Sequence, residues 1–207
     1  MIKNFSRGLA PAALAFAVLA PAAAHADEYA LTDAITSLPV AAEVRDGYRR
    51  ELCPHWKDDD KNGCSARNDV LIEEAIEAPT VGAGCTITGG AWHSYYDDVV
   101  IYVPAGIDID RPIPFAELHY SGGYGWTTER RRRYANDLGS DITLVGVTAR
   151  SNRQKSDQDP ATWMLAPGVH CRYIGEWVAT KHRWALSVDQ AEREALLRPS
   201  GSGCPCG

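Results

Sequence analysis

After residue 26 the sequence contains no long apolar run, so we expect no membrane-spanning helix in the mature chain. It has no C-x-x-C pair of the kind that holds structural zinc, and no glycine-rich phosphate loop. The serines lack a Ser/His/Asp signature, and the chain has no internal repeats. These absences argue against a zinc ribbon, a nucleotide-binding loop, a serine hydrolase and a repeat protein.

The amino terminus carries the one long apolar segment. LAPAALAFAVLAPAAA follows Lys3 and Arg7 and ends in the small-x-small sequence AHA. This order predicts an export signal over residues 1–26, cleaved near Ala26, and a secreted or periplasmic mature protein. Residues 27–207 are long enough for one domain with a single core, and we expect a monomer.

The charge is acidic overall but uneven along the chain. The formal charge is −6, and loss of the signal, which contains two basic residues and no acidic one, makes it −8. An acidic total argues against indiscriminate binding of nucleic acid, because that affinity comes largely from neutralised phosphates. Residues 130–155, however, contain seven basic residues and only two acidic ones. This segment is either a basic groove or a solvated helix face.

The sequence contains six cysteines, which in an exported chain imply disulfides. Six cysteines allow fifteen pairings, and among them we favour Cys64 with Cys85, and Cys171 with Cys204 or Cys206. Cys53 then takes the remaining tail cysteine or stays free.

The residue pattern of the mature sequence changes at residue 79, from helical to strand-like. Over residues 27–78, the segments ALTDAITSL, DGYRRELCPHW and ARNDVLIEEAIEA predict helices, the last with apolar residues at helical spacing. Beyond them, glycine and proline separate CTIT, AWHSYY and VVIYV, which are rich in β-branched and aromatic residues. These pieces predict a hairpin or a small antiparallel sheet that leads into IDIDRPIP.

The second half of the chain mixes short helices with one strong strand. FAELHY and TTERRRRYANDL predict helices, the second capped by Thr127 or Thr128. ITLVGVTA predicts a strand, and we expect Ser151 to cap the helix after it. YIGEWVATKHRW and SVDQAEREALLR predict helices near the carboxy terminus, with Ser187 and Gln190 as a capping box. The predicted fold class is therefore α+β, stabilised by disulfides.

One ordered set of polar residues points to chemistry. Asp110 ends an expected strand, Asn136 lies in a connecting loop, and Asn152 begins the helix after ITLVGVTA, with Lys155 three residues later. This order resembles the HNH (ββα-metal) nucleases, in which two strands and a helix hold one divalent ion against a scissile phosphate. The chain is similar to small exported bacterial HNH-endonuclease-family proteins, whose domain is like the carboxy-terminal domain of GmrSD restriction enzymes. The likeness covers nearly all of the mature chain, through GYRRELCPHWKDDDKNGCSARNDVL, GCTITGGAWHSYYDD, the DIDxxxPxAE box, RRRYANDL, VTARSNRQKSDQDPATW and CRYIGEWVATKHRWALSVD.

The resemblance implies a ββα-metal core over residues 99–165 and a role for each matching residue. Asp110 and Asn152 would be metal ligands, helped by Asp108, for one Mg²⁺ or Mn²⁺. Asn136 would orient the general base. The substrate would be nucleic acid, DNA in preference to RNA, and the residues facing its phosphate would be Arg133, Arg153 and Lys155.

Position 111 departs from the family pattern, because Arg111 stands where the general-base histidine belongs. A guanidinium group with a pKa above about 12 cannot accept a proton at pH 7, and losing a general base lowers a rate by about 10² to 10⁴. A fixed cation beside Asp110 would also compete with a metal. His119 and His93 are candidate substitutes, although a lone histidine is more often a satisfied polar group.

A second cluster has the opening spacing of a calcium loop. Asp58, Asp60 and Asn62 alternate, and Asp69 stands at the twelfth position. That position normally carries glutamate, and Cys64 interrupts the loop, so an acidic turn held by a disulfide is the simpler interpretation. We expect the six tryptophans to pack in the core or at its rim rather than stack on bases.

Three functions remain open at this point. The first, which the resemblance favours, is an exported nuclease that hydrolyses phosphodiester bonds with a divalent metal, impaired by Arg111. The second is a nuclease-like scaffold without catalysis that binds nucleic acid or another extracytoplasmic partner through a basic groove. The third is a small structural protein outside the cytoplasm.

Overall fold

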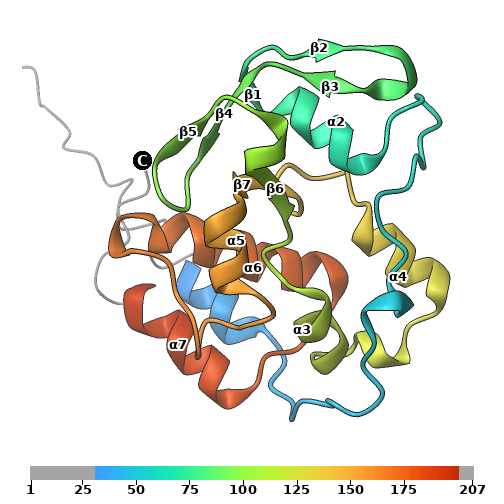
Figure 1. The fold of residues 1–207 in the computed structure, drawn as a ribbon. Coiled ribbons are helices and arrows are strands. Elements are labelled where there is room, and N and C mark those ends of the chain that lie inside the picture. Colours follow the sequence, from blue (N-terminus) through green and yellow to red (C-terminus); the bar gives the residue numbers. More distant parts are fainter. Residues whose placement is uncertain (1–30, 201–207) are drawn as a thin grey trace, which may run out of the picture.

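The computed structural model describes residues 31–200 (Figure 1). The expected signal and the tail cysteines Cys204 and Cys206 lie outside this range. Residues 31–37 are helical, and the later helices are α2 (Ala66–Glu73), α3 (Phe115–Tyr120), α4 (Thr128–Ala135), α5 (Ala149–Lys155), α6 (His170–Trp184) and α7 (Gln190–Ser200). Short 3₁₀ turns lie at Arg50–Leu52, Ala83–Cys85, Pro104–Gly106, Gly123–Gly125 and Pro167–Val169.

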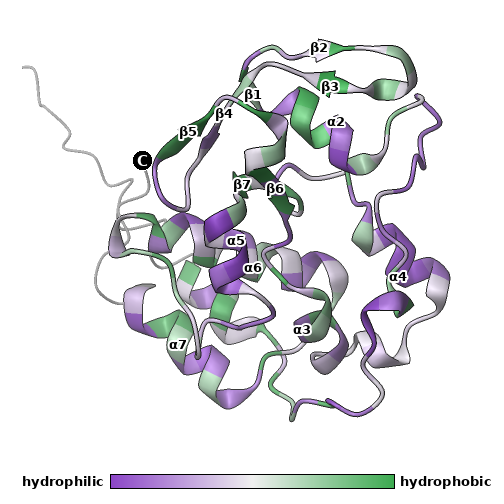
Figure 2. Ribbon diagram, viewed as in Figure 1, coloured by the Kyte–Doolittle hydropathy of each residue, from purple (hydrophilic) through white to green (hydrophobic). Residues whose placement is uncertain are grey.

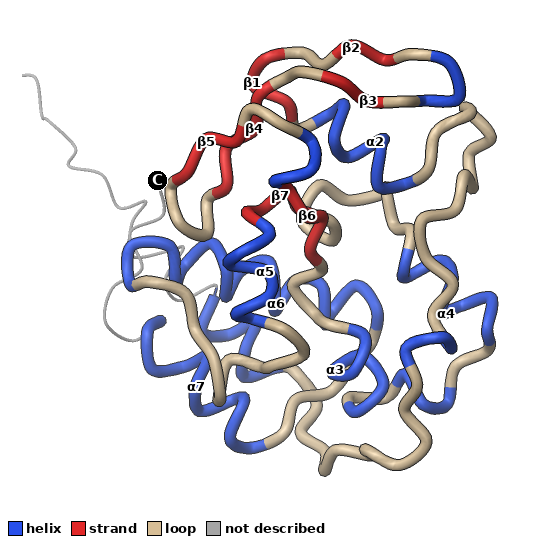
Figure 3. The backbone as a smooth tube through the Cα atoms, in the orientation of Figure 1, coloured by secondary structure: helices blue, strands red, loops and turns tan. Residues whose placement is uncertain are grey.

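The strands form three small antiparallel sheets (Figure 3). They are β1 (Ala75–Glu77), β4 (Ala91–Ser94) and β5 (Val99–Ile101) in the order β1-β4-β5, β2 (Thr80–Val81) with β3 (Ile87–Thr88), and β6 (Ile107–Asp110) with β7 (Val145–Thr148). This mixed architecture confirms the α+β prediction at the level of helices around small antiparallel sheets.

The pair β6–β7 lies between two hydrophobic cores. Ile107 and Ile109 pack in a smaller core with residues of α2 and β4, and Val145 and Val147 pack in a larger core with residues of α6. Figure 2 shows the hydrophobic strands beside the hydrophilic α5. Successive side chains of a strand point to opposite faces. Asp108 and Asp110 of β6 therefore point away from the face on which Ile107 and Ile109 are buried.

The helix α5 begins where β7 ends, and a small polar network holds the junction. The Thr148 hydroxyl accepts a hydrogen bond from the Ser151 amide at 3.2 Å, so Thr148 is the N-cap. Asp97 accepts hydrogen bonds from the hydroxyls of Thr148 and Ser151 at 2.5 and 2.8 Å. The prediction that Ser151 caps this helix is therefore wrong, because its hydroxyl is engaged by the β4–β5 hairpin.

Other local predictions are confirmed in part. Thr127 caps α4 by accepting from the Arg130 amide, and FAELHY forms α3. DGYRRELCPHW forms only one 3₁₀ turn, since Gly47 is left-handed at φ +77 and no side chain caps the turn. Asp189, rather than Ser187, accepts the hydrogen bond from the Glu192 amide at the start of α7.

The predicted disulfide between Cys64 and Cys85 is confirmed. Cys171 is also disulfide-bonded, and its two predicted partners lie outside the described residues. Cys53 is free and buried. The first disulfide joins the turn before α2 to the loop before β3, and so ties the acidic segment to the sheet region.

Glu74 joins the end of α2 to β7. Its Oε2 accepts a hydrogen bond from the Gly146 amide at 2.6 Å. A Cβ at Gly146 would lie 2.6 Å from the same oxygen, so a larger residue here would displace the Glu74 carboxylate. Burial raises the pKa of Glu74 to about 7, although the Gly146 hydrogen bond and Arg172 lower it.

Stability should therefore fall as pH rises through this range. Between pH 4.5 and about 7 the folded protein keeps a proton on Glu74 that the unfolded chain has lost. The free energy of unfolding should decrease across this window by up to about 3 kcal/mol from this group. Urea unfolding of wild type and Glu74→Gln measures it: the variant should gain on wild type as pH rises, and a constant difference would contradict the assignment.

Candidate functional site

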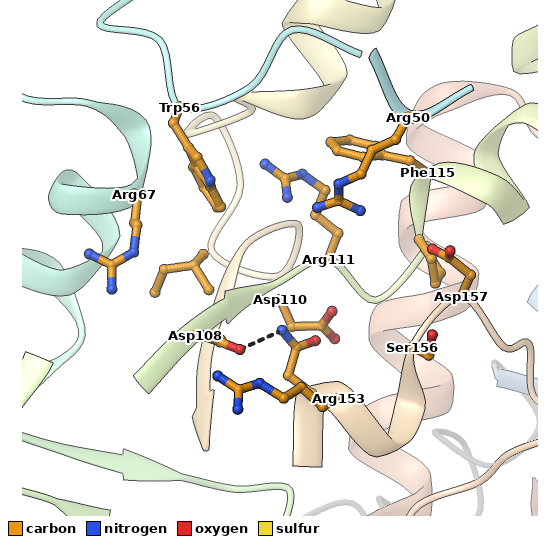
Figure 4. Close-up of a pocket in the computed structure, with 13 residues that line it drawn as sticks. Arg50, Trp56, Arg67, Asp108, Asp110, Arg111, Phe115, Arg153, Ser156 and Asp157 are labelled. Carbon is orange, nitrogen blue, oxygen red and sulfur yellow. Dashed lines mark hydrogen bonds between the residues drawn. The ribbon is translucent and has the colours of Figure 1, made fainter. Parts of the chain in front are cut away.

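A pocket of about 440 Å³ opens where β6, α5 and the segment before α2 meet (Figure 4). Asp108 and Asp110 of β6 line it, as does Asn152 of α5. The expected meeting of strand carboxylates with a helix amide therefore occurs. Four arginines share the pocket with these groups, and they are Arg50, Arg67, Arg111 and Arg153.

Asp108 and Asn152 form the link across the pocket floor. The Asn152 side-chain amide donates a hydrogen bond to Asp108 Oδ2 at 3.2 Å, shown as the dashed line in Figure 4. Both side chains are half-buried. The pair can offer oxygen atoms to a ligand from two different elements.

Asp110 is already paired inside the protein. Lys155 is fully buried, and its ammonium lies 2.9 Å from Asp110 Oδ2. The Tyr96 hydroxyl donates to the same oxygen at 2.6 Å, and Lys155 also donates to the Arg111 carbonyl at 2.8 Å. Burial lowers the pKa of Lys155, and Asp110 opposes that shift. Lys155 thus does not face a ligand, contrary to the expectation from the resemblance.

This arrangement does not fit the expected divalent ion. A metal ligand must offer unshared oxygen electron pairs, but the Asp110 carboxylate receives an ammonium and a phenol. An ion there would have to displace Lys155, which would then be a buried cation without its carboxylate. Asp108 and Asn152 alone supply one charged and one neutral ligand.

Arg111 is buried without a counter-ion. Its guanidinium lies between Trp56 and Phe115, 4.4 and 4.5 Å from the two ring centroids (Figure 4). One nitrogen donates to the Ala135 carbonyl, while Nε is buried and has no partner among the described residues. Burial lowers the pKa of Arg111 to about 10, so the group remains charged at pH 7. Its side chain is only 6% exposed.

The other three arginines lie nearer the solvent. The Arg50 guanidinium is 5.1 Å from the centroid of the Phe115 ring that Arg111 also contacts. Arg67 donates to the carbonyls of Pro104 and Ile107. Within residues 31–200, none of the four guanidinium groups of the pocket forms an ion pair. The pocket therefore presents several unneutralised cations to an incoming ligand.

Two backbone conformations at the pocket are unusual. Trp56 has φ +58 and Ser156 has φ +51, although neither is glycine. Left-handed backbone at such residues is strained, and strain of this kind gathers at functional sites. At Trp56 it accompanies the placement of the indole over Arg111.

Two further predicted residues lie outside the pocket. The Asn136 side chain accepts from the Lys57 amide at 2.8 Å and donates to the Pro54 carbonyl at 2.9 Å, so it holds the loop that carries Trp56. His119 is buried on α3, and its Nε2 lies 2.9 Å from the Asp46 carbonyl. His119 is thus engaged away from the pocket, and no histidine of residues 31–200 lines it.

The remaining predicted residues are also placed elsewhere. Arg133 is exposed and lines a separate hollow with Asp137 and Trp184. In the acidic turn, Asp58 accepts from the Gly63 amide and Asp60 from Asn62, and the Asn62 oxygen accepts from Cys64. Protein donors thus engage the oxygens expected to bind calcium.

Comparison with known proteins relates the chain to a protein that is named as secreted. It is 35% identical over 153 residues to an uncharacterized secreted protein of Arthroderma benhamiae, and the match covers 73% of this chain and 74% of that protein. The chain belongs to the family of this secreted protein. The relationship supports the predicted export. No family model and no solved structure matches the chain. None of the helices within residues 31–200 is long and apolar enough to cross a membrane.

Sequence reasoning did not mark several residues of the pocket, among them Arg50, Trp56, Arg67 and Phe115. Arg50, Trp56 and Arg67 come from the segment before and within α2, and no local pattern marks them as ligands. Trp56 packs partly against the smaller core, as expected, yet it also forms a pocket wall. The available signal was GYRRELCPHWKDDDKNGCSARNDVL, a segment that includes Arg50, Trp56 and Arg67 and is one of those on which the expected resemblance to HNH-endonuclease-family proteins rests.

The Lys155–Asp110 pair predicts a large and recoverable loss of stability. Lys155→Met leaves a buried carboxylate without its cation, and the free energy of unfolding should fall by about 3 to 5 kcal/mol. Adding Asp110→Asn removes the second charge and should recover much of that loss. Urea denaturation measures both, with Arg153→Met on the exposed face of α5 as a control that should change stability by less than about 0.5 kcal/mol. A double variant as unstable as Lys155→Met would contradict this role.

Proposed function

We propose that the protein is a secreted binding module that holds a phosphate group of nucleic acid in the pocket around Arg111. The mature chain would begin near Asp27, after removal of residues 1–26 as an export signal. One observation carries the proposal: within residues 31–200, Arg111 is buried and charged without a counter-ion, in a pocket with three further arginines that form no ion pair.

A buried charge normally has a partner, because leaving water without one costs several kcal/mol. In this protein two aromatic rings and one carbonyl offset only part of the cost for Arg111. An anion entering the pocket would complete the neutralisation. The planar guanidinium matches the oxygen geometry of phosphate, which makes phosphate the ligand group of choice.

The order of elements supports nucleic acid as the source of that phosphate, and the resemblance implies DNA in preference to RNA. An antiparallel pair, β6–β7, is followed at once by α5 across one end, which is the order that the resemblance to HNH nucleases implies. The acidic total charge favours a local contact at one pocket over a broad electrostatic footprint.

Metal-dependent phosphodiester hydrolysis is the second candidate, with Mg²⁺ or Mn²⁺ as the ion. It is favoured by the gathering of Asp108, Asp110 and Asn152 in one pocket. Against it stand Arg111 at the base position and Lys155 on the Asp110 carboxylate. The geometry therefore supports binding better than catalysis.

The binding proposal predicts an arginine-dependent affinity for oligonucleotides. In fluorescence anisotropy with labelled DNA, Arg111→Met should weaken binding by about tenfold to a hundredfold, because a charge-assisted contact is lost. Arg50→Met, at an exposed position, should weaken it in the same direction, and each change should reduce the salt slope by about 1. Arg133→Met is the matched control and should bind like wild type. A chelator should have no effect.

Equal affinity of wild type, Arg50→Met and Arg111→Met would reject the pocket as the binding site. A folded Arg50→Met variant guards against misreading a loss of structure in Arg111→Met, because Arg50 is exposed while Arg111 is buried.

A plasmid-nicking assay separates the two candidate functions. With Mg²⁺ or Mn²⁺, neither wild type nor Arg111→His should cleave, because Lys155 still neutralises Asp110 in both. Metal-dependent cleavage by wild type would reject the binding-only proposal. Cleavage gained by Arg111→His would show that a base alone was missing, and would support the second candidate.

A further inference from the structure

We infer that the pocket receives the terminal phosphate of a nucleic-acid strand, a phosphomonoester, rather than a phosphodiester within the chain. This inference rests on the proposed function and adds the class of ligand. It depends on the depth of Arg111, on the spacing of its aromatic neighbours and on the distribution of charge in the pocket.

Arg111 lies deep in the pocket. Arg111 is 6% exposed, and the rings of Trp56 and Phe115 lie within 4.5 Å of its guanidinium on either side. Next to it on the strand, Asp110 is 7% exposed and neutralised by Lys155. A phosphodiester has a nucleoside on each side, so two chain segments would need to leave such a narrow site. A terminal phosphate enters first and leaves with one segment behind it.

The size of the pocket agrees with this mode of entry. Its volume of about 440 Å³ lies within the range of pockets that hold one small ligand. It is therefore large enough for one end group with its nucleoside. Trp56 and Phe115 offer apolar walls beside the phosphate position.

The charges that line the pocket also bear on the class of ligand. A phosphomonoester carries a charge of about −1.5 to −2 at pH 7, compared with −1 for a phosphodiester. The guanidinium groups of Arg50 and Arg111 lie 5.1 and 4.5 Å from the centroid of the same Phe115 ring, and neither forms an ion pair within residues 31–200, so a dianion would neutralise both. Asp108 and Asp157 also line the pocket and would repel a second phosphate. The set therefore favours a ligand whose charge is concentrated in one group.

The test compares oligonucleotides of one sequence that differ only at their ends. They carry a 5′-phosphate, a 3′-phosphate or hydroxyls at both ends, with an internal label, and binding to the mature protein is followed by anisotropy. At least one phosphorylated end should bind about tenfold tighter or more than the hydroxyl form, as one additional charged contact implies. Circular single-stranded DNA, which has no ends, should compete no better than the hydroxyl form.

The variants show whether the preference comes from this pocket. Arg50→Met should reduce the preference for the phosphorylated end, while Arg133→Met should keep it. Inorganic phosphate should compete with the phosphorylated oligonucleotide more effectively than with the hydroxyl form.

The outcomes distinguish failure of the inference from failure of the proposed function. If all linear and circular DNA binds equally and binding still depends on Arg111, the terminal-phosphate inference is overturned and the binding function stands. If no DNA binds, both are overturned. A preference for the phosphorylated end that survives Arg50→Met and Arg111→Met unchanged would also overturn the inference, because the end would be recognised elsewhere.

Discussion

The buried ion pair between Lys155 and Asp110 sets the character of the whole pocket. It joins α5 to β6 with an ammonium that has no exposure to solvent and a carboxylate that also binds Tyr96. Because either charge alone would be buried and unpaired, the pair holds helix and strand in one register. The pair also neutralises the carboxylate of Asp110, which lines the pocket and which a divalent ion would need as a ligand. The remaining charge of the site then comes mainly from arginine.

Arg111, the residue after Asp110, forms no ion pair within residues 31–200. Its carbonyl takes part in the Lys155 network, but its guanidinium is held by two aromatic rings and a single carbonyl. Asn136 supports this arrangement indirectly, because its side chain is hydrogen-bonded to Pro54 and Lys57 in the loop that carries Trp56. On the proposed function, Arg111, which stands where the resemblance places a general base, would anchor an anion. The two roles are compatible, because a site without a proton acceptor can still bind phosphate.

Several elements could be predicted because their causes are local. The helix α4 follows from its Thr127 cap, and β7 follows from a run of β-branched residues. The Cys64–Cys85 bond agrees with the pairing chosen from cysteine positions. The segment around Arg50 was wrongly predicted as a helix, since it is stabilised by contacts with distant residues such as Asn136 rather than by its own periodicity. The N-cap of α5 is Thr148 rather than Ser151, because Asp97 accepts a hydrogen bond from the Ser151 hydroxyl. At the start of α7, Asp189 rather than Ser187 accepts the hydrogen bond from the Glu192 amide.

The sequence by itself predicted the α+β class and the gathering of Asp108, Asp110 and Asn152 at one place, because these depend on residue patterns along the chain and on a resemblance that runs through most of it. For the first disulfide it offered only a favoured pairing among several, which the structure confirms. Only the tertiary structure decided that Lys155 turns inward to Asp110, and that Trp56 and Phe115 enclose Arg111. Several charges lie within reach of one another in this region. Which of them pair, and which remain free for a ligand, depends on burial, and burial is a property of the packed molecule rather than of any local pattern.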